Sequence, residues 1–367
     1  MKIAFDHQIF CLKPYGGVSR YFVNLVRALI MSKVNVKVFA PLHQNKYTDD
    51  LTENIQNYKR ISKFPLRTKK LFTVLNQVIT RKWIADWNPD IVHETYFSRV
   101  SSASRSYPSV LTVYDMIHEL FPGDFSFLDR TSSLKQIAVN RAKHIICISH
   151  NTRNDLIRLF GTPAKKITVI HLGFNEKFFA QKSRFLISIH GNPFLLYVGA
   201  RSGYKNFKGL LKAFASSKKL KTDFNIIAFG GGRFTKSELD FIRYLDYPTG
   251  QVCHASGTDD ILSTYYRSAA AFVFPSLYEG FGIPPLEAMA SQCPVIASDR
   301  SAIPEVVGPA GEYFNPEKID DIRSAIEAVV YSRQRTQELL KLGGQRLVNF
   351  SWEKCARESL KVYESIV

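Results

Sequence analysis

Two scarcities in the sequence narrow the class of protein that it encodes. It has only five cysteines, and no two of them have the spacing of a metal-ligand or redox pair. This scarcity predicts a reducing, cytoplasmic location and not a disulfide-stabilised secreted protein. No apolar run reaches the ~18 residues that span a bilayer, and Met1–His7 lacks the apolar core of a signal peptide. We therefore expect a protein that is not integral to a membrane.

Acidic residues are absent from Asn54 to Ala85, in a chain of net charge +17. The same segment is rich in basic residues: Lys59, Arg60, Lys63, Arg67, Lys69, Lys70, Arg81 and Lys82. Among these, apolar residues recur at helical spacing: Leu71, Phe72, Leu75, Val78, Ile79 and Trp83. Residues 54–85 therefore predict a basic amphipathic segment that contacts anionic lipid at the inner face of the cytoplasmic membrane. Alternatively, the apolar stripe packs on its own domain while the lysines are solvated.

The excess of positive charge also fits a protein without catalytic activity that binds nucleic acid or a membrane surface. However, no helix-turn-helix, zinc-knuckle or aromatic RNA-binding motif accompanies the charge. We therefore expect no nucleic-acid partner.

Short apolar runs alternate with amphipathic stretches along the whole chain. The strands expected from them lie at residues 2–5, 34–39, 91–93, 109–114 and 145–149, and again at 195–199, 225–230, 252–254, 271–275 and 294–298. Helices are expected between them, for example at 18–31 and 127–142. This alternation predicts an α/β fold of parallel sheets with helices on both faces.

The length of the chain is sufficient for two domains, each with its own core. A polar stretch without clear periodicity, 182–193, places the boundary between Ile170 and Phe194. The expected domains are 1–175 and 190–350. The tail, 351–367, predicts an amphipathic helix capped by Ser351.

The most informative motif runs from Phe274 to Ala290. It places Glu279 and Glu287 on either side of a turn that opens a helix, and the turn consists of Gly280, Phe281, Gly282 and Ile283. A helix N-terminus preceded by glycines attracts anions through its backbone N–H groups. Because carboxylates would repel a phosphate at such a site, we expect Glu279 and Glu287 to accept hydrogen bonds from sugar hydroxyls instead.

Two further loops carry groups that suit a phosphate. Arg201 and Lys205 follow the first strand of the second half, at the end of the strand where doubly wound sheets bind ligands. A guanidinium offers a planar fork to phosphate oxygens, and an ammonium offers a compact charge. Gly16 and Gly17 open the first helix and allow a phosphate to approach the backbone closely.

Candidate acceptor-side residues follow strands of the first half: His93, Asp115 and His118. Of these, His118 is the candidate catalytic residue, because imidazole titrates near neutral pH and can accept a proton or a hydrogen bond.

The Glu-x7-Glu motif of Glu279 and Glu287, together with the Arg201–Lys205 pair, resembles the retaining glycosyltransferases of family 4. Within that family it is most similar to the mannosyltransferase-like branch of bacterial polysaccharide and O-antigen biosynthesis. The resemblance implies the GT-B architecture, in which two Rossmann-like domains face a central cleft. The acceptor domain would be 1–175 with the helix of 351–367 packed on it, and the donor domain would be 190–350.

The resemblance also implies a reaction. A hexose, mannose or a related sugar, would move with retention from a nucleoside diphosphate sugar to a hydroxyl of a growing, lipid-linked glycan. A GDP-sugar is favoured, and the alternatives are a UDP-sugar or a sugar-nucleotide epimerase of the same fold. No cofactor or metal is expected, because the chain lacks the Asp-x-Asp triplet that anchors a metal in the other glycosyltransferase fold.

The resemblance assigns roles to individual residues. Glu279 would hold hydroxyls of the donor sugar and Glu287 the ribose diol, while Arg201 and Lys205 would stabilise the leaving diphosphate. The turn of residues 280–283 would offer N–H groups to sugar and phosphate. The sequence departs from the family at Ser19, where a third glycine is common, and at Tyr114, where many members have a histidine before Asp115.

Overall fold

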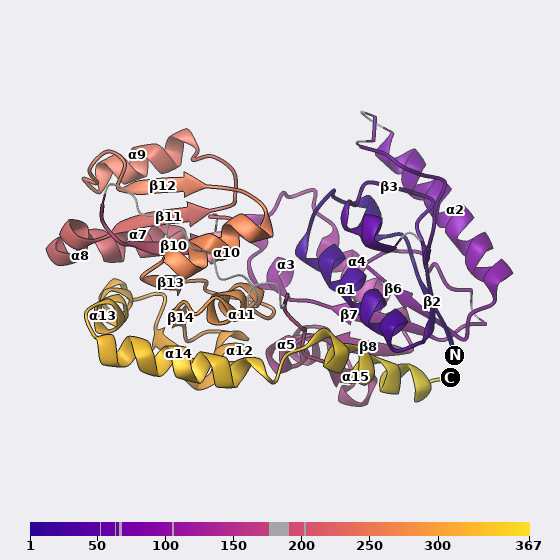
Figure 1. Cartoon of the computed structure of the whole chain (residues 1–367). Coiled ribbons are helices and arrows are strands. Elements are labelled where there is room, and N and C mark those ends of the chain that lie inside the picture. Colours follow the sequence, from indigo (N-terminus) through magenta and orange to yellow (C-terminus); the bar gives the residue numbers. More distant parts are fainter. Residues whose placement is uncertain (52, 63, 66–67, 105, 176–190, 202) are drawn as a thin grey trace. The chain divides into compact units, whose positions relative to one another are not determined.

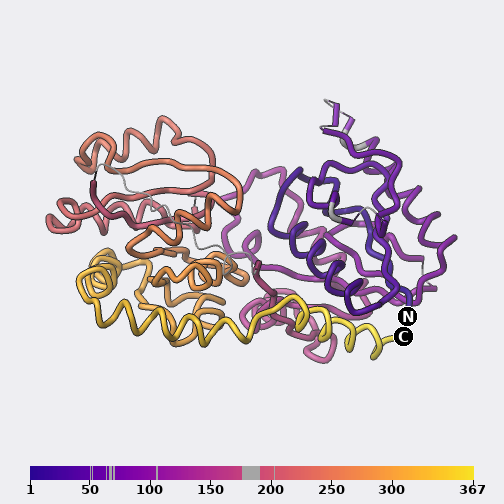
Figure 2. Tube along the Cα trace, in the orientation of Figure 1, coloured from indigo at the N-terminus to yellow at the C-terminus, as the bar shows by residue number. Residues whose placement is uncertain are grey.

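The computed structural model describes residues 1–51, 53–62, 64–65, 68–104, 106–175, 191–201 and 203–367. Its contacts divide the chain into two compact units (Figure 1). The first unit consists of Met1–Gly173 with Ser351–Val367, and the second consists of Phe174–Phe350. Most of the linker expected at 182–193 lies outside the described residues. After the second unit the chain returns to the first as its C-terminal helix, drawn in yellow in Figure 2.

Among the described residues, the first unit contains a parallel sheet of seven strands in the order β4–β2–β1–β6–β7–β8–β9. Their bounds are β1 Lys2–Phe5, β2 Asn35–Phe39, β4 Ile55–Gln56, β6 Ile91–Glu94, β7 Ser109–Val113, β8 His144–Cys147 and β9 Ile167–Val169. Two short strands pair separately: β3 Leu42–His43 and β5 Lys59–Arg60. The chain adds strands outward from β1 in one direction and then, from β6, in the other. The carboxyl ends of β1 and β6 are therefore the point where the strand order reverses.

Helices surround this sheet: α1 Gly17–Met31, α2 Lys69–Trp87, α3 Ile117–Leu120, α4 Thr131–Arg141, α5 His150–Phe160 and the C-terminal α15 Trp352–Glu364. Short 3-10 turns are η1 Ile9–Cys11, η2 Tyr47–Leu51, η3 Pro122–Asp124 and η4 Ala164–Lys166. α15 packs on α1, where the rings of Tyr21 and Trp352 lie 6.1 Å apart. Ser351 caps α15 as expected, because its side chain accepts a hydrogen bond from the Lys354 N–H.

The described part of the second unit has a parallel sheet of six strands in the order β12–β11–β10–β13–β14–β15, which is the order of a Rossmann fold. Their bounds are β10 Phe194–Val198, β11 Asn225–Phe229, β12 Val252–Ala255, β13 Ala271–Phe274, β14 Val295–Ser298 and β15 Gly311–Phe314. The helices are α7 Phe207–Ala215, α8 Lys218–Asp223, α9 Lys236–Tyr244, α10 Asp259–Ser268, α11 Ile283–Ala290, α12 Ile303–Val307, α13 Ile319–Val330 and α14 Arg333–Leu347, with 3-10 turns η5 Gly203–Lys205 and η6 Gly308–Ala310.

The core of the second unit follows from the alternation of side chains along its strands. Leu195 and Tyr197 of β10 join a buried cluster with residues of α7 and α13. On the other side, α10 contacts β10 and α11 contacts β13 and β14. The order here reverses between β10 and β13, so the loops that follow these two strands meet at one edge of the sheet.

The predicted fold class is confirmed. The errors of the prediction concern the bounds of individual helices and strands. The helix expected at 127–142 begins only at Thr131, because the Asp129 side chain accepts the Thr131 N–H at 2.7 Å and fixes the helix start there. Phe127 is fully exposed. The sequence analysis also did not anticipate β3, β4, β5 and β9, which have only two or three residues each. It missed β15 as well, because this strand begins with Gly311 and Glu312 and so has no continuous apolar run.

The basic segment forms β4, β5 and α2. The apolar residues predicted to form one stripe of this segment fall into two groups on α2, one exposed and one half-buried. One face of α2 is exposed, and we call it the α2 apolar face: Leu71, Val74, Leu75 and Val78. The other members of the stripe are half-buried: Phe72, Ile79 and Trp83. Three positions of the helix are buried, and two of them are polar: Asn76, Thr80 and Ile84. Lys63 and Arg67 lie outside the described residues. No helix in the described part of the chain is long and apolar enough to cross a membrane.

Candidate active site

Two predicted site residues that are distant in the sequence meet at the reversal point of the second sheet. Lys205 ends the loop after β10, and Glu279 lies in the loop after β13. The Lys205 Nζ donates to both carboxylate oxygens of Glu279, at 2.7 and 2.9 Å. The two loops are also joined through the backbone, because the Leu277 N–H donates to the Tyr204 carbonyl at 2.7 Å. The strand order therefore brings this cation and this carboxylate together.

Glu279 is held from three directions. Besides Lys205, the Ser276 hydroxyl donates to its Oε1 at 2.6 Å, and its backbone N–H donates to the Ser301 Oγ at 2.8 Å. The residue is 8% exposed, so only a small part of it remains open to solvent. Ser276 and Ser301 were not predicted, since a serine in a loop gives no signal in sequence.

The turn after Glu279 leads directly into α11, as expected. Gly282 adopts φ +123°, which side chains rarely tolerate, and is the N-cap of the helix. Gly280 and Phe281 are buried, and the Phe281 ring contacts Phe350 edge to face. Ile283 begins α11, and Glu287, 4% exposed, lies one turn into it. The turn thus places the N-terminus of α11 about one helical turn from Glu287.

Arg201 is more fully engaged than the sequence analysis expected. Its Nε donates to Glu238 Oε1 at 2.7 Å, and its other two nitrogens donate to the Gly230 and Arg233 carbonyls at 2.8 and 3.1 Å. The guanidinium also lies 4.8 Å from the centre of the Phe234 ring. A two-pronged contact with phosphate would therefore require Arg201 to release some of these partners.

Glu238 was not predicted as a site residue. Burial alone would raise the pKa of its carboxyl, but hydrogen bonds from Arg201 and Thr235 hold that pKa below its usual value. The Thr235-x-x-Glu238 spacing is a recognisable capping box for α9, and both of its hydrogen bonds form. The cap was therefore readable in the sequence, whereas the contact with Arg201 depends on the tertiary fold.

In the first unit, Gly16 is the N-cap of α1 and Gly17 its first residue. A side chain at Gly17 would meet no atom within 4 Å, so the space above this turn is open. Ser19, which replaces a common glycine, is buried. Its hydroxyl donates to the Gly16 carbonyl at 3.0 Å and accepts from Asn45 Nδ2 at 2.8 Å. The serine thus fixes the glycine turn to the neighbouring loop.

His93 does not lie at an open strand end, and this expectation is corrected. Its side chain is fully buried, with Nδ1 2.7 Å from the Tyr363 hydroxyl and Nε2 2.8 Å from the Thr112 hydroxyl. Burial lowers the pKa of His93 to about 3. Both ring nitrogens therefore take part in hydrogen bonds, one to α15 and one to β7, and neither is exposed to solvent.

Asp115 and His118 lie around the short helix α3. The Asp115 carboxylate accepts the Ile117 N–H at 3.0 Å and lies 3.9 Å from the buried Lys135 ammonium. Lys135 pairs more closely with Glu119, at 2.7 Å. His118 stacks on Phe125 and borders a surface pocket of about 470 Å³. Burial and the Lys135 charge lower the pKa of His118, which favours its neutral form.

His7 is a residue that the sequence analysis missed. It follows β1 and is 3% exposed, and its Nδ1 has no hydrogen-bond partner among the described residues. Burial lowers its pKa, although the neighbouring Asp6 opposes this shift. Asp6 itself is bonded to the Thr95 N–H and hydroxyl, at 2.8 and 2.6 Å. A buried nitrogen without a partner at a strand end is a candidate ligand group.

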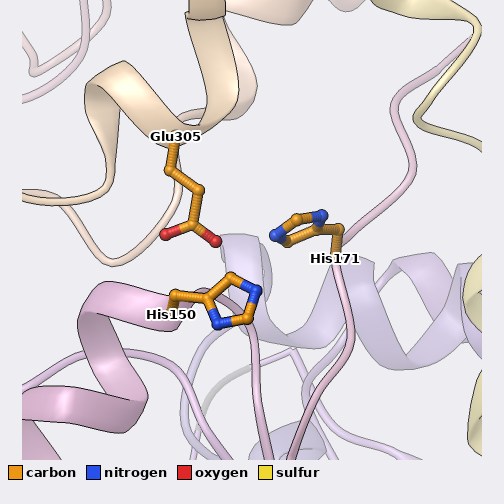
Figure 3. A group of neighbouring side chains, drawn as sticks. All are labelled: His150, His171 and Glu305. Carbon is orange, nitrogen blue, oxygen red and sulfur yellow. The ribbon is translucent and has the colours of Figure 1, made fainter.

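Two other histidines of the first unit lie near each other. His150 begins α5, His171 follows β9, and their rings are 6.0 Å apart (Figure 3). Glu305, drawn in the same figure, belongs to α12 of the second unit. Two imidazoles are fewer than the three protein ligands of a catalytic zinc site. The pair therefore carries no metal assignment, and independence from metal stays a prediction.

Comparison with protein families places both halves of the chain in glycosyltransferases. Residues 15–178 match the family described as Glycosyltransferase Family 4. Residues 179–343 match the family described as Glycosyl transferases group 1.

Two of the relatives are O-antigen mannosyltransferases. The O-antigen chain mannosyltransferase B of Escherichia coli is 25% identical over 383 residues, which cover 96% of each chain. The O-antigen chain mannosyltransferase RfbU of Salmonella typhimurium is 30% identical over 221 residues, which cover 60% of each chain.

Solved structures show the same fold at lower identity. Sucrose-phosphate synthase from Thermosynechococcus elongatus has a TM-score of 0.76 at 19% identity, and covers 99% of this chain and 98% of its own. Anabaena HepE, in complex with UDP, has a TM-score of 0.73 at 17% identity, and both chains are covered completely. The chain therefore belongs to glycosyltransferase family 4, with the GT-B fold, and is a glycosyltransferase with mannosyltransferases among its relatives.

Proposed function

We propose that the protein transfers a hexose, with retention, from a nucleoside diphosphate sugar to a hydroxyl of a growing, lipid-linked glycan. The observation that carries this proposal is the Lys205–Glu279 pair beside the N-terminus of α11, at the reversal point of the second sheet. An ammonium, a carboxylate and a row of N–H groups match the diphosphate and hydroxyls of such a donor.

The reaction exchanges one bond at the anomeric carbon for another. The bond between this carbon and the diphosphate oxygen breaks, and a bond to the acceptor oxygen forms on the same face. The acceptor proton passes to the leaving diphosphate. Lys205 and the turn of residues 280–283 stabilise the negative charge that develops on that group. Glu279 and Glu287 accept hydrogen bonds from the sugar and the ribose.

The Lys205–Glu279 ion pair gives this mechanism a resting state. Without donor, each charge neutralises the other. When the donor binds, the diphosphate takes Lys205, and sugar hydroxyls replace the ammonium as donors to Glu279. Arg201, held by Glu238, contributes to phosphate binding only after it rearranges. We therefore assign the larger share of leaving-group stabilisation to Lys205.

The direct test is substitution of the pair with a matched control. We expect Lys205→Met and Glu279→Gln each to lower turnover by about 100-fold or more. Turnover is compared at a temperature at which thermal unfolding shows each variant to be folded. Arg335 and Glu312 of the same unit form an ion pair of the same length, 2.7 Å, and comparable exposure. Arg335→Met should therefore leave turnover unchanged. Near wild-type transfer by Lys205→Met would remove the assignment.

The relatives favour mannose, because two of them are O-antigen mannosyltransferases. For this sugar we propose a GDP-sugar as the donor. HepE, which has the same fold, was solved with UDP-glucose as well as UDP, so a UDP-sugar is the alternative. Calorimetric titration with GDP, UDP, GDP-mannose and UDP-glucose separates the two. Adding a chelator to the titration also tests the expectation that no metal is needed. If that expectation is right, the chelator should leave nucleotide binding unchanged.

We also propose that α2 contacts an anionic membrane surface and so brings the enzyme to a lipid-linked acceptor at the cytoplasmic face. The exposed α2 apolar face supports this, as do the exposed Arg81 and Lys82 near the end of the helix. Co-sedimentation with anionic vesicles should weaken with salt and with Arg81→Gln and Lys82→Gln together. Binding that ignores both changes would contradict the proposal.

A further inference from the structure

The first unit contains a cavity of about 490 Å³ at the reversal point of its own sheet. His7 and Gln8, which follow β1, line one side, and Tyr96 and Phe97, which follow β6, line another. α2 supplies a third wall. The volume lies within the range of ligand pockets, and the position corresponds to the point where open α/β sheets bind ligands.

The walls of this cavity are apolar. Four of its lining residues are large hydrophobic side chains that are exposed on the unit: Leu12, Val74, Val78 and Val100. Val74 and Val78 belong to the α2 apolar face, so the cavity opens directly beside that face. A cluster of exposed apolar side chains around a cavity marks a place where apolar surface is covered by a ligand.

The amides in the walls are already satisfied within the protein. Gln8 Nε2 donates to Asp6 at 2.6 Å, and Gln77 Nε2 donates to the Ser101 carbonyl at 2.8 Å. Asn76 exchanges two hydrogen bonds with the backbone of Leu42, at 2.8 and 2.9 Å. These residues therefore present little unmet polarity to the cavity, which favours a ligand without polar groups at this depth.

The imidazole of His7 and the guanidinium of Arg99 also belong to the lining of the cavity. The buried Nδ1 of His7 has no hydrogen-bond partner among the described residues. Arg99 is exposed and also lines the cavity, and no described lining residue carries a carboxylate. The charge of the cavity is therefore positive, and an anionic head group suits it better than a cationic or zwitterionic one.

We infer that this cavity binds the hydrocarbon chain of the acceptor, an amphiphile of the prenyl diphosphate type, with Arg99 at its anionic head. His7 provides a hydrogen bond to the first polar group beyond the chain. This inference rests on the proposed function and specifies its acceptor. It differs from attachment of α2 to a membrane surface, because it places the chain inside a cavity of the protein.

Farnesyl diphosphate, a short and water-soluble amphiphile of this type, is the probe, and its binding to the full chain is measured by calorimetry. It should bind, whereas inorganic diphosphate alone should not. Val78 and Leu71 provide a matched pair: both lie on the α2 apolar face, at 63% and 58% exposure, but only Val78 lines the cavity. We expect Val78→Gln to weaken binding about tenfold, and Leu71→Gln and Val78→Leu to leave it within about twofold.

Equal losses in Val78→Gln and Leu71→Gln would overturn the inference in favour of simple surface adsorption. Equal binding of inorganic diphosphate would overturn it as well. A Val78→Gln effect on self-association in ultracentrifugation, without an effect on the amphiphile, would identify the face as a contact between copies of this chain and also refute it. Nucleotide binding distinguishes a failure of this inference from a failure of the proposed function. If GDP or UDP binds but farnesyl diphosphate does not, only this inference fails.

Discussion

Gly231 allows the position of Arg201 to be tested without touching the arginine itself. A Cβ at residue 231 would lie 2.7 Å from the Gly199 carbonyl oxygen and 2.9 Å from a terminal nitrogen of Arg201. The first contact is with backbone, which cannot turn away as a side chain can. Gly231→Ala should therefore displace the Gly199–Arg201 loop, which leads into the loop of Lys205.

The adjacent Gly232 supplies the control. Both glycines have φ in the left-handed region, +67° and +77°, but a Cβ at residue 232 would meet nothing within 4 Å. Alanine at either position costs roughly 1–2 kcal/mol of backbone strain. Only Gly231→Ala adds a steric overlap, which in packed sites costs about 1–3 kcal/mol. The total expected loss is thus about 2–5 kcal/mol for Gly231→Ala and about 1–2 kcal/mol for Gly232→Ala.

Thermal unfolding and calorimetric titration with the preferred nucleotide measure the two effects. At about 2–4 °C per kcal/mol for a unit of this size, the two variants should be clearly separated in midpoint temperature. Gly231→Ala should also lose about tenfold in nucleotide affinity, a change of ~1.4 kcal/mol, whereas Gly232→Ala should bind normally. Identical stability and affinity in the two variants would refute the claim that Gly231 makes room for Arg201.

Two further predictions concern the first unit. Because the pKa of His93 is about 3 in the folded chain and about 6.5 when unfolded, its neutral form stabilises the fold above pH 6.5, and this stability is lost as the pH falls toward 3. Chemical denaturation measures the free energy of unfolding at pH 6.5 and at pH 5. This free energy should fall between the two pH values by about 2 kcal/mol less in His93→Gln than in the parent protein. Lys135→Met should destabilise the unit by about 3 kcal/mol, because it leaves the buried Glu119 unpaired. As a control, Arg243→Met breaks an exposed pair with Asp240 and should change stability by less than about 1 kcal/mol. Equal losses in the two variants would contradict the role of burial.

The sequence was sufficient for the fold class because the strands are local signals. β10 and β13 are continuous apolar runs bounded by glycine or proline, and each was expected within one residue of its actual bounds. The turn of residues 280–283 was equally readable, since its glycines and the prolines after it can open a helix but cannot continue a strand. In each case the pattern and the structure depend on the same few neighbouring residues.

The errors arise where the structure depends on distant partners. Nothing near His93 in sequence indicates that Tyr363 will bury it, and nothing near Arg201 indicates that Glu238 will take its guanidinium. His7 was missed for the opposite reason. It is a candidate because its buried Nδ1 has no hydrogen-bond partner within the described residues, and the sequence gives no sign of this. Residues at strand ends can therefore be proposed from sequence, but whether they face a ligand or the core depends on the strand order.

The two sheets share a reversal of strand order but use it for opposite chemistry. After β10 and β13, the loops supply an ammonium, a carboxylate and a guanidinium, and each charge is paired within its own unit. After β1 and β6, the loops supply His7, Tyr96 and Phe97, and the described lining includes no carboxylate. Topology thus fixes where a ligand binds in each sheet, whereas the side chains that follow the strands decide its chemistry. The proposed donor is charged and soluble, and the proposed acceptor is apolar and lipid-borne. These two ligands would require different linings, because a single lining could not stabilise both.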